Sequence, residues 1–329
     1  MFRSSLNSLP VLECISARVS IFVFSALIFS FESWGQSKSE SLFRGQQSEL
    51  PSQIVRTQGN NNNSEFIESD LGLQRPVEVK DKGFGYHLGF SSRIYHTNNA
   101  ASASSGAGRE SAGIWENSLN NFFLLGAYDF GGVAFSPLFS LGYSKFSHFG
   151  DDDIDVLDFD TLQFGPNAFF QFDQGWTFRA GIGVMLDFSP NNNMEKTYHQ
   201  ITPILAVGKG FSIGSASSSL ELSIAYHVTK SNQIIDDLLD RLEIGFLWAT
   251  NLQINQFQIS PYFRLAYAGY ANQNRDDLLG SFGLETSYLF NDLFSAHLFS
   301  GLSFRSSNDE LFDFNRLDVG CGARLEAKF

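Results

Sequence analysis

FNRLDVGCGARLEAKF, residues 314–329, alternates apolar and polar side chains over almost its whole length. Charged residues and glycines separate its apolar positions, which are Leu317, Val319, Cys321, Ala323, Leu325, Ala327 and Phe329. Because successive side chains of a β-strand point to opposite faces, this stretch predicts a strand with one apolar and one charged face. Soluble strands typically have about five or six residues, whereas this one is long enough to cross a bilayer at a tilt.

The same two-residue period runs back through the chain as far as Phe84. Residues 220–229, 241–248 and 257–267 each place apolar side chains on one face and polar or small ones on the other. Counting by this rule predicts twelve strands near residues 83–96, 116–130, 133–148, 157–172, 176–188, 197–210, 218–230, 240–252, 256–270, 278–290, 293–305 and 314–329.

The connections between these strands alternate in length. Gly131-Gly132, Asp173-Gln174-Gly175 and Asn291-Asp292 are tight, and the connections between them are longer and polar. Short periplasmic turns and long extracellular loops are typical of outer-membrane barrels, and an even strand number puts both barrel ends on the periplasmic side. The acidic clusters at 151–160, 236–240, 276–277 and 309–313 then fall at the extracellular side.

Prolines recur at matching places in a weak internal repeat. Residues 135–143 (FSPLFSLGY) resemble residues 259–267 (ISPYFRLAY), and Pro203 marks a candidate third copy. Proline cannot donate a hydrogen bond to a neighbouring strand, so it concentrates at bulges and strand starts. We interpret these prolines as structural.

The first part of the chain predicts export. Residues 19–31 form an apolar run of thirteen, shorter than the roughly 20 residues of a membrane helix, and Ser33-Trp34-Gly35 resembles a cleavage site. We expect residues 1–35 to be a signal peptide. Residues 36–82 are rich in Ser, Gln, Asn and charge, so they predict a flexible polar periplasmic arm, with a plug inside the barrel as the alternative. Residues 83–329 are the predicted barrel.

Composition excludes several classes of protein. The net charge of −13 argues against nucleic-acid binding, and Cys321 alone follows the signal peptide, which excludes an intramolecular disulfide framework. A soluble β-sandwich also shows alternating strands, but the strand length, the export signal and the aromatic residues near strand ends favour a membrane. The predicted fold is all-β, a closed antiparallel transmembrane barrel in the outer membrane. Its interfacial aromatics are Phe84, Tyr143, Trp176, Tyr267, Tyr288 and Phe329.

Phe329, preceded by apolar residues at 327, 325, 323 and 321, resembles the terminal signal that the barrel-assembly machinery of Gram-negative bacteria recognises. The strand count and the preceding arm are similar to twelve-stranded autotransporter translocator barrels and, less closely, to small solute channels. This resemblance covers roughly residues 83–329, and the arm is too short to be a passenger. It implies contacts with outer-membrane lipid, lipopolysaccharide and the assembly machinery.

The charges predicted to face the barrel interior are the candidate functional residues. Both signs occur among them, so they indicate either a selective water-filled pore or a lumen closed by ion pairs. We expect inward Phe123, Leu125, Phe169, Tyr262 and Phe299 to narrow the lumen. The predicted inward charges are Arg93, Arg179, Glu221, Arg241, Glu243, Arg264, Glu285, Arg305, Arg316, Asp318, Arg324 and Glu326.

The function predicted from these features is a narrow passive channel for small solutes. The alternative is a closed structural or surface-interaction barrel, like an autotransporter barrel without its passenger, whose extracellular loops bind partners. We expect no enzyme, cofactor or metal site. Although Asp151, Asp153 and Asp155 resemble the start of a calcium loop, the glycine and the closing glutamate are missing. The sequence places no serine and aspartate around one histidine as a catalytic triad requires.

Overall fold

A computed structural model describes residues 84–102, 111–150, 157–190, 194–231 and 240–329. The predicted signal peptide, 1–35, and the predicted arm, 36–82, lie outside the described residues. So do most of the acidic cluster at 151–160 and the residues 232–239.

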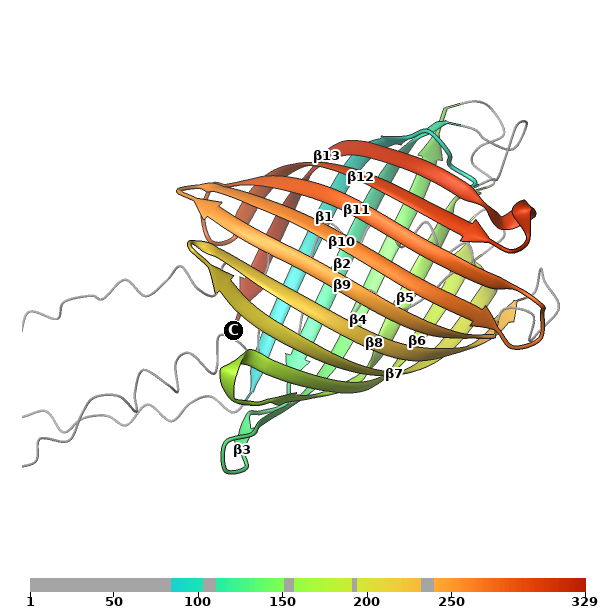
Figure 1. Cartoon of the computed structure of the whole chain (residues 1–329). Helices are drawn as coiled ribbons and strands as arrows, with labels where there is room; N and C mark the ends of the chain where they lie inside the picture. The colour runs from blue at the N-terminus through green and yellow to red at the C-terminus, as the bar shows by residue number, and fades with distance from the viewer. Residues whose placement is uncertain (1–83, 103–110, 151–156, 191–193, 232–239) are drawn as a thin grey trace, which may run out of the picture.

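The described residues form twelve long strands, a two-residue strand and two short 3-10 helices (Figure 1). The helices are η5 (Asp173–Gly175) and η7 (Glu310–Phe312), and β3 spans Tyr128–Asp129. None of the described helices is long and apolar enough to cross a membrane. The long strands are β1 (Gly85–Thr97), β2 (Ala112–Leu124), β4 (Ala134–Phe149), β5 (Phe159–Gln171), β6 (Trp176–Ser189), β7 (Glu195–Ile213), β8 (Ala216–Ser231), β9 (Arg241–Ile254), β10 (Phe257–Tyr270), β11 (Asp276–Leu289), β12 (Phe294–Ser307) and β13 (Phe314–Lys328).

These strands close into a barrel. Each long strand pairs antiparallel with its chain neighbours, β2 pairs with β4 past the short β3, and β13 pairs with β1. The closing seam ends at Phe329, whose backbone N–H donates to Tyr86 O at 2.9 Å and whose O accepts from Tyr86 N at 3.1 Å. A closed sheet leaves no edge strand, which is the condition for placing a sheet in hydrocarbon. The predicted closed twelve-strand barrel is confirmed.

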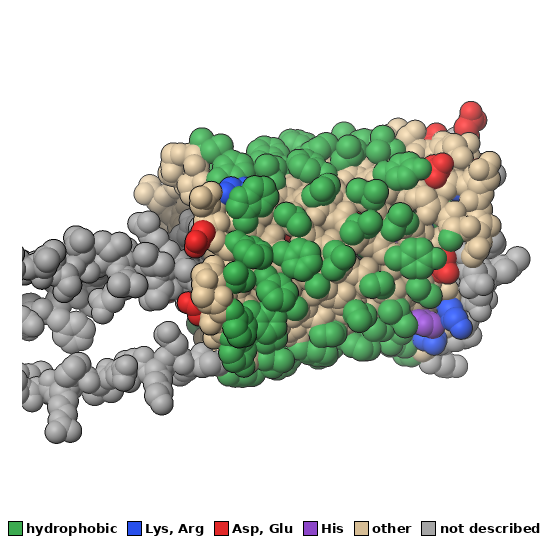
Figure 2. Space-filling model, turned by 60° about the horizontal axis from the view of Figure 1, so that its bottom comes forward, with side chains coloured by type: hydrophobic (Ala, Val, Ile, Leu, Met, Phe, Trp, Pro, Cys, Tyr) green, Lys and Arg blue, Asp and Glu red, His purple; other side chains and the backbone are tan. Residues whose placement is uncertain are grey.

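The alternation read from the sequence sorts side chains between the two faces of the wall. Along β9, Arg241, Glu243 and Leu247 are buried, while Leu242, Ile244 and Phe246 are exposed. Figure 2 shows hydrophobic side chains spread over the outer surface, with charged ones mainly towards the two ends of the barrel. The apolar face therefore points outward and the polar face points inward.

The two rims of the barrel differ. One rim, here called the turn side, carries the short connections 172–175, 214–215, 255–256 and 290–293, together with Phe329 (Figure 1). Gly214 and Asn255 take positive φ values of 60° and 55°, as two-residue hairpin turns require. The opposite rim, the loop side, carries the longer connections, including 98–111 and 308–313.

The prediction for the second strand was wrong. The sequence pattern predicted a strand at 116–130, whereas β2 covers Ala112–Leu124 with the even-numbered side chains inward. Phe122 is buried inside, Leu125 is exposed, and Phe123 lies on the outer face with its ring 5.0 Å from that of Tyr86. A shift of one residue moves every side chain of a strand to the other face, which is why Phe123 and Leu125 were assigned inward.

Replacing Ile244 with Arg tests the outer face. Ile244 is 45% exposed on the outer face of β9, three residues from the loop-side end of the strand, so a guanidinium there would enter the hydrocarbon between the interface and the midplane. We expect Ile244→Arg to lower the free energy of unfolding by about 1–3 kcal/mol, measured by urea titration in lipid vesicles. Ile244→Leu is the control and should change little. An unchanged stability for Ile244→Arg would contradict the outward orientation.

Candidate functional site

The polar inner wall is the candidate functional site. Ten of the predicted inward charges are buried, and Glu221 and Arg305 are mostly buried, with 16% and 9% of their side chains exposed. They lie on β1, β6 and β8 to β13. Side chains that lie far apart in the sequence meet here, because neighbouring strands are aligned by their register.

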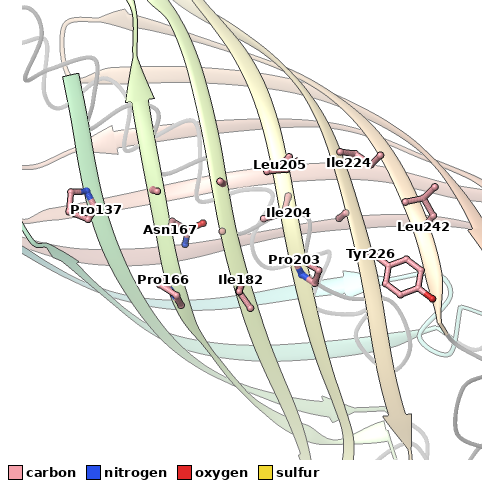
Figure 3. Close-up of a pocket in the computed structure, with 14 residues that line it drawn as sticks. Pro137, Pro166, Asn167, Ile182, Pro203, Ile204, Leu205, Ile224, Tyr226 and Leu242 are labelled. Atoms are coloured by element: carbon pink, nitrogen blue, oxygen red, sulfur yellow. The ribbon is translucent and has the colours of Figure 1, made fainter. Parts of the chain in front are cut away.

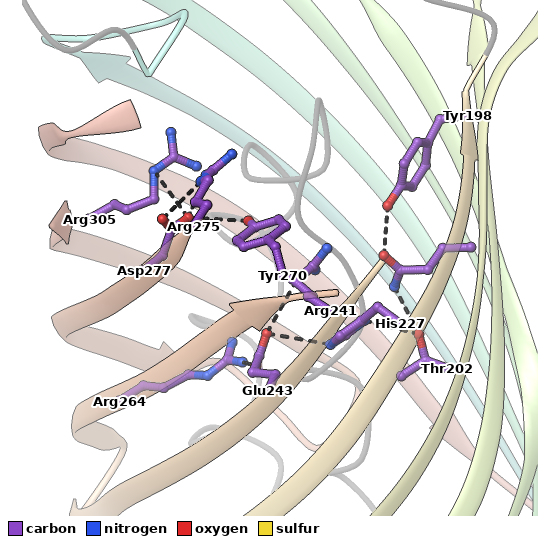
Figure 4. A network of polar contacts seen from close by, with 11 residues as sticks. Tyr198, Thr202, His227, Arg241, Glu243, Arg264, Tyr270, Arg275, Asp277 and Arg305 are labelled. Atoms are coloured by element: carbon purple, nitrogen blue, oxygen red, sulfur yellow. Dashed lines mark hydrogen bonds and ion pairs between the residues drawn. The ribbon is translucent and has the colours of Figure 1, made fainter. Parts of the chain in front are cut away.

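Glu243 on β9 is the centre of one charged cluster, the Glu243 cluster, made of Glu243, Arg264, His227 and Arg241 (Figure 4). Arg264 on β10 donates to Glu243 at 2.7 Å. His227 Nε2 on β8 lies 3.4 Å from the other carboxylate oxygen, and Arg241 Nε lies 3.9 Å from it. One carboxylate thus contacts polar side chains from three adjacent strands.

A hydrogen-bonded line continues from this cluster along β7. Thr202 Oγ1 lies 3.2 Å from His227 Nδ1. Gln200 donates to Thr202 at 2.9 Å, and Tyr198 donates to Gln200 at 2.7 Å (Figure 4). This line could not be predicted from the sequence, because the alternate residues on β7 show no charge pattern.

A second cluster lies across β11, β13 and β1. Arg324 on β13 is 3.5 Å from Glu285 on β11 and 3.9 Å from Glu326. Glu326 is also 3.9 Å from His87 on β1, and Ser287 donates to Glu285 at 3.0 Å. Arg324 therefore reaches past β12 to a carboxylate two strands away.

Other ion pairs complete the inner wall. Arg93 pairs with Glu116 on β2 and lies over the Phe299 ring at 5.4 Å. Arg179 on β6 reaches past β7 to Glu221 on β8 at 2.7 Å. Glu116 is a site residue that the sequence analysis missed, since the wrong register of the second strand put it outside.

At the loop side, Arg275 joins two connections of the barrel. Its guanidinium bonds Asp277, with Nε to Oδ1 at 2.9 Å, and lies 4.2 Å from the Tyr270 ring and 3.4 Å from the Phe312 ring. Arg305 lies 4.0 Å from Asp277 (Figure 4). Arg305 also lies over the Phe312 ring. These contacts of Arg275, here called the Arg275 clamp, connect the β10–β11 and β12–β13 loops. The sequence analysis missed it because loop residues follow no period.

Among the described residues, no group of three or more His, Cys, Asp or Glu side chains is arranged to hold a metal ion. Arg316 and Asp318, which are neighbours on the inner face of β13, pair with each other at 3.1 Å. The inner wall is thus a surface of arginines and carboxylates that bind one another.

A closed wall that is apolar outside and charged inside defines a transmembrane β-barrel of the outer membrane. No family model and no curated protein matches the chain.

Solved structures of similar fold were found. The β domain of the Bordetella autotransporter Brka is 11% identical, with a TM-score of 0.43 over 74% of this chain and 99% of that chain. An outer-membrane channel from Pseudomonas putida F1 is 11% identical, with a TM-score of 0.47 over 78% and 100% of the two chains. The translocator domain of autotransporter NalP from Neisseria meningitidis is 10% identical, with a TM-score of 0.41 over 87% and 96%. These similarities concern fold alone.

Removing the charge of Glu243 tests the central cluster. Glu243→Gln keeps the shape but leaves the buried arginines and His227 without the carboxylate, so we expect a loss of about 3–5 kcal/mol in the free energy of unfolding. The double variant E243Q/R264Q should lose less than the sum of the single changes, because it removes both partners. Additive losses in the double-mutant cycle would show that the two side chains are not coupled.

Proposed function

We propose that the protein is a narrow passive channel for small solutes. The observation that supports this is the inner wall, where arginines and carboxylates line a closed barrel from the turn side to the loop side. Charged walls are favourable only beside water or beside opposite charges, and this wall offers both signs to a passing ion.

Long side chains make the channel narrow. The Arg179–Glu221 and Arg324–Glu285 pairs each extend over an intervening strand, so their side chains lie along the inner wall. Phe169 and Tyr262 are buried on the inner face as predicted, and Phe299 contacts Arg93 and Tyr95 there. A twelve-stranded barrel is intermediate between barrels filled by their own side chains and wide porins, so these groups limit the size of solutes.

A closed structural barrel is the second candidate. It is supported by the burial of Arg93, Arg241 and Arg316, each at most 1% exposed, because arginines lining a wide water-filled pore would be solvated. In that case the paired charges stiffen the wall, and the loop side binds partners. Residues 103–110 and 151–156 of those loops lie outside the described residues.

The partners remain proposals as well. The exposed apolar wall would contact outer-membrane lipid and lipopolysaccharide. Phe329 is 72% exposed at the turn side, and its ring stacks 5.8 Å from Tyr86, a position that leaves its side chain accessible to the assembly machinery.

Single-channel recording tests the channel. In planar bilayers under a KCl gradient, the pure full-length protein should give small conductance steps. Glu221→Gln should lower the preference for K⁺ over Cl⁻, because it removes a negative charge from the path, and Arg179→Gln should raise it. Lys145→Gln removes an exposed charge on the outer face of β4 and should leave the reversal potential unchanged.

Absence of conductance steps from correctly folded protein would reject the channel and favour the closed barrel. Equal reversal potentials for all three variants would show that the current does not pass the Arg179–Glu221 pair.

A further inference from the structure

The pairing between strands is interrupted in one part of the wall. In three places two successive residues of a strand have no paired partner on the neighbouring strand, and each such gap is here called a skip. The β5–β6 skip lies between the pairs Phe164↔Val184 and Asn167↔Gly181. The β7–β8 skip lies between the pairs Ile201↔Val228 and Ile204↔Ala225. A third skip lies in the β9–β10 pairing between Ile259↔Leu252 and Tyr262↔Ala249. The pairings of β11, β12, β13, β1, β2 and β4 with one another run through the described strands without such a skip.

Each skip contains a proline. Pro166, Pro203 and Pro261 stand there, and the register puts Ile182, Tyr226 and Thr250 opposite them. Proline has no N–H to donate, so the carbonyl that would accept from it loses a ladder hydrogen bond. Within a bilayer no water replaces that bond, so the hydrogen-bonded ladder is weakened at these positions.

An apolar hollow of about 760 Å³ lies over two of these points (Figure 3). Pro166 and Pro203 line it together with the residues opposite them, Ile182 and Tyr226. Leu205 and Leu242 contribute apolar side chains from β7 and β9. Because this face of the wall meets hydrocarbon, the hollow opens to the interior of the bilayer rather than to water.

On β6, β7 and β8, the inner residues directly behind the hollow carry no charge. Gly181, Ile204 and Ala225 follow one another across β6, β7 and β8 at the level of the skips, and Ala206 lies beside them. Ile204, Ala206 and Ala225 are buried, and the charged Arg179 is one inner position away towards the turn side. At the level of the skips, the inner face on β6 to β8 is therefore apolar, between the polar Asn167 on β5 and the charged Glu243 on β9.

From this coincidence the geometry points to a lateral portal: the wall between β5 and β8 opens at Pro166 and Pro203 to exchange uncharged apolar molecules between the bilayer and the lumen. The occupant of the hollow is an apolar solute dissolved in the membrane. Separation of β7 from β8 at this level breaks fewer backbone hydrogen bonds than separation of a pair with an unbroken ladder, such as β11 and β12. The portal does not depend on the channel proposed above, because its entrance is in lipid and not at either rim.

A disulfide lock tests the portal. In a cysteine-free background (Cys14→Ser, Cys321→Ser), Ile204→Cys with Ala225→Cys joins β7 to β8 beside Pro203 at directly paired positions, which disulfide geometry accommodates. Ser281→Cys with Ser303→Cys is the matched control, an inner pair joining β11 to β12 where the ladder is unbroken. The probe is a long-chain alkane carrying a diazirine, added to phospholipid vesicles that contain the full chain.

After illumination, mass spectrometry locates the label. The unlocked protein should carry label on the inner residues Ala206 and Ser223. The oxidised 204/225 lock should lose it, reduction should restore it, and the 281/303 lock should retain it. Three results would overturn the portal. They are the absence of inner label from the unlocked protein, inner label that persists in the oxidised 204/225 lock, and inner label that disappears equally in both locks.

A second variant needs no cysteine. Pro166→Val with Pro203→Val returns both N–H groups to the ladder and should lose inner labelling while the barrel stays folded; retained labelling would contradict the role of the prolines. Conductance of the 204/225 lock is recorded in parallel. A protein that never conducts but shows lock-sensitive labelling would reject the channel and keep the portal, and a conducting protein without inner label would do the reverse.

Discussion

Every backbone N–H and C=O inside a bilayer needs a partner within the protein, and the rest of this structure depends on that constraint. Twelve long strands meet it together, because the β1–β13 pairing leaves no edge. Closure also decides where each side chain goes, since the pleat of a closed sheet has an outside and an inside. The apolar face meets lipid, and arginines and carboxylates are enclosed. Enclosure then makes pairing necessary, because an isolated buried charge is strongly unfavourable.

The inner ion pairs and the proline skips are unevenly distributed around the wall. Clusters around Glu243 and Arg324 connect β8 through β13 and β1, and the clamp at Arg275 connects two loops above them. The β5–β8 part lacks ladder bonds at Pro166 and Pro203 and has small inner side chains. Several charged clusters thus connect the strands from β8 to β1, while the Arg179–Glu221 pair and the Thr202–His227 contact connect strands within the β5–β8 part.

Much of the fold could be predicted from the sequence, because a period of two over long strands is a strong signal. Eleven predicted strands match the described ones within a few residues, and the inner positions of β9 and β13 follow directly from alternation. The second strand failed, since residues 116–130 contain adjacent apolar residues at Phe122–Leu125 that fit either face. That failure hid Glu116. Partners such as Arg264 and Glu243 could not be predicted, because pairing across strands depends on register. The clamp of Arg275 and Phe312 lies in loops, where no period applies.

The orientation of the wall is tested most directly by a spin-label scan along β9. Single cysteines from Arg241 to Ile254 would be labelled in the cysteine-free protein, and their collision rates with oxygen and with a water-soluble nickel chelate compared in lipid vesicles. The structure predicts that oxygen, which concentrates in hydrocarbon, relaxes labels at 242, 244, 246 and 248 more strongly than labels at 241, 243, 245 and 247. Equal access of the nickel chelate to both sets, or the opposite alternation, would contradict a barrel with lipid outside and a charged interior.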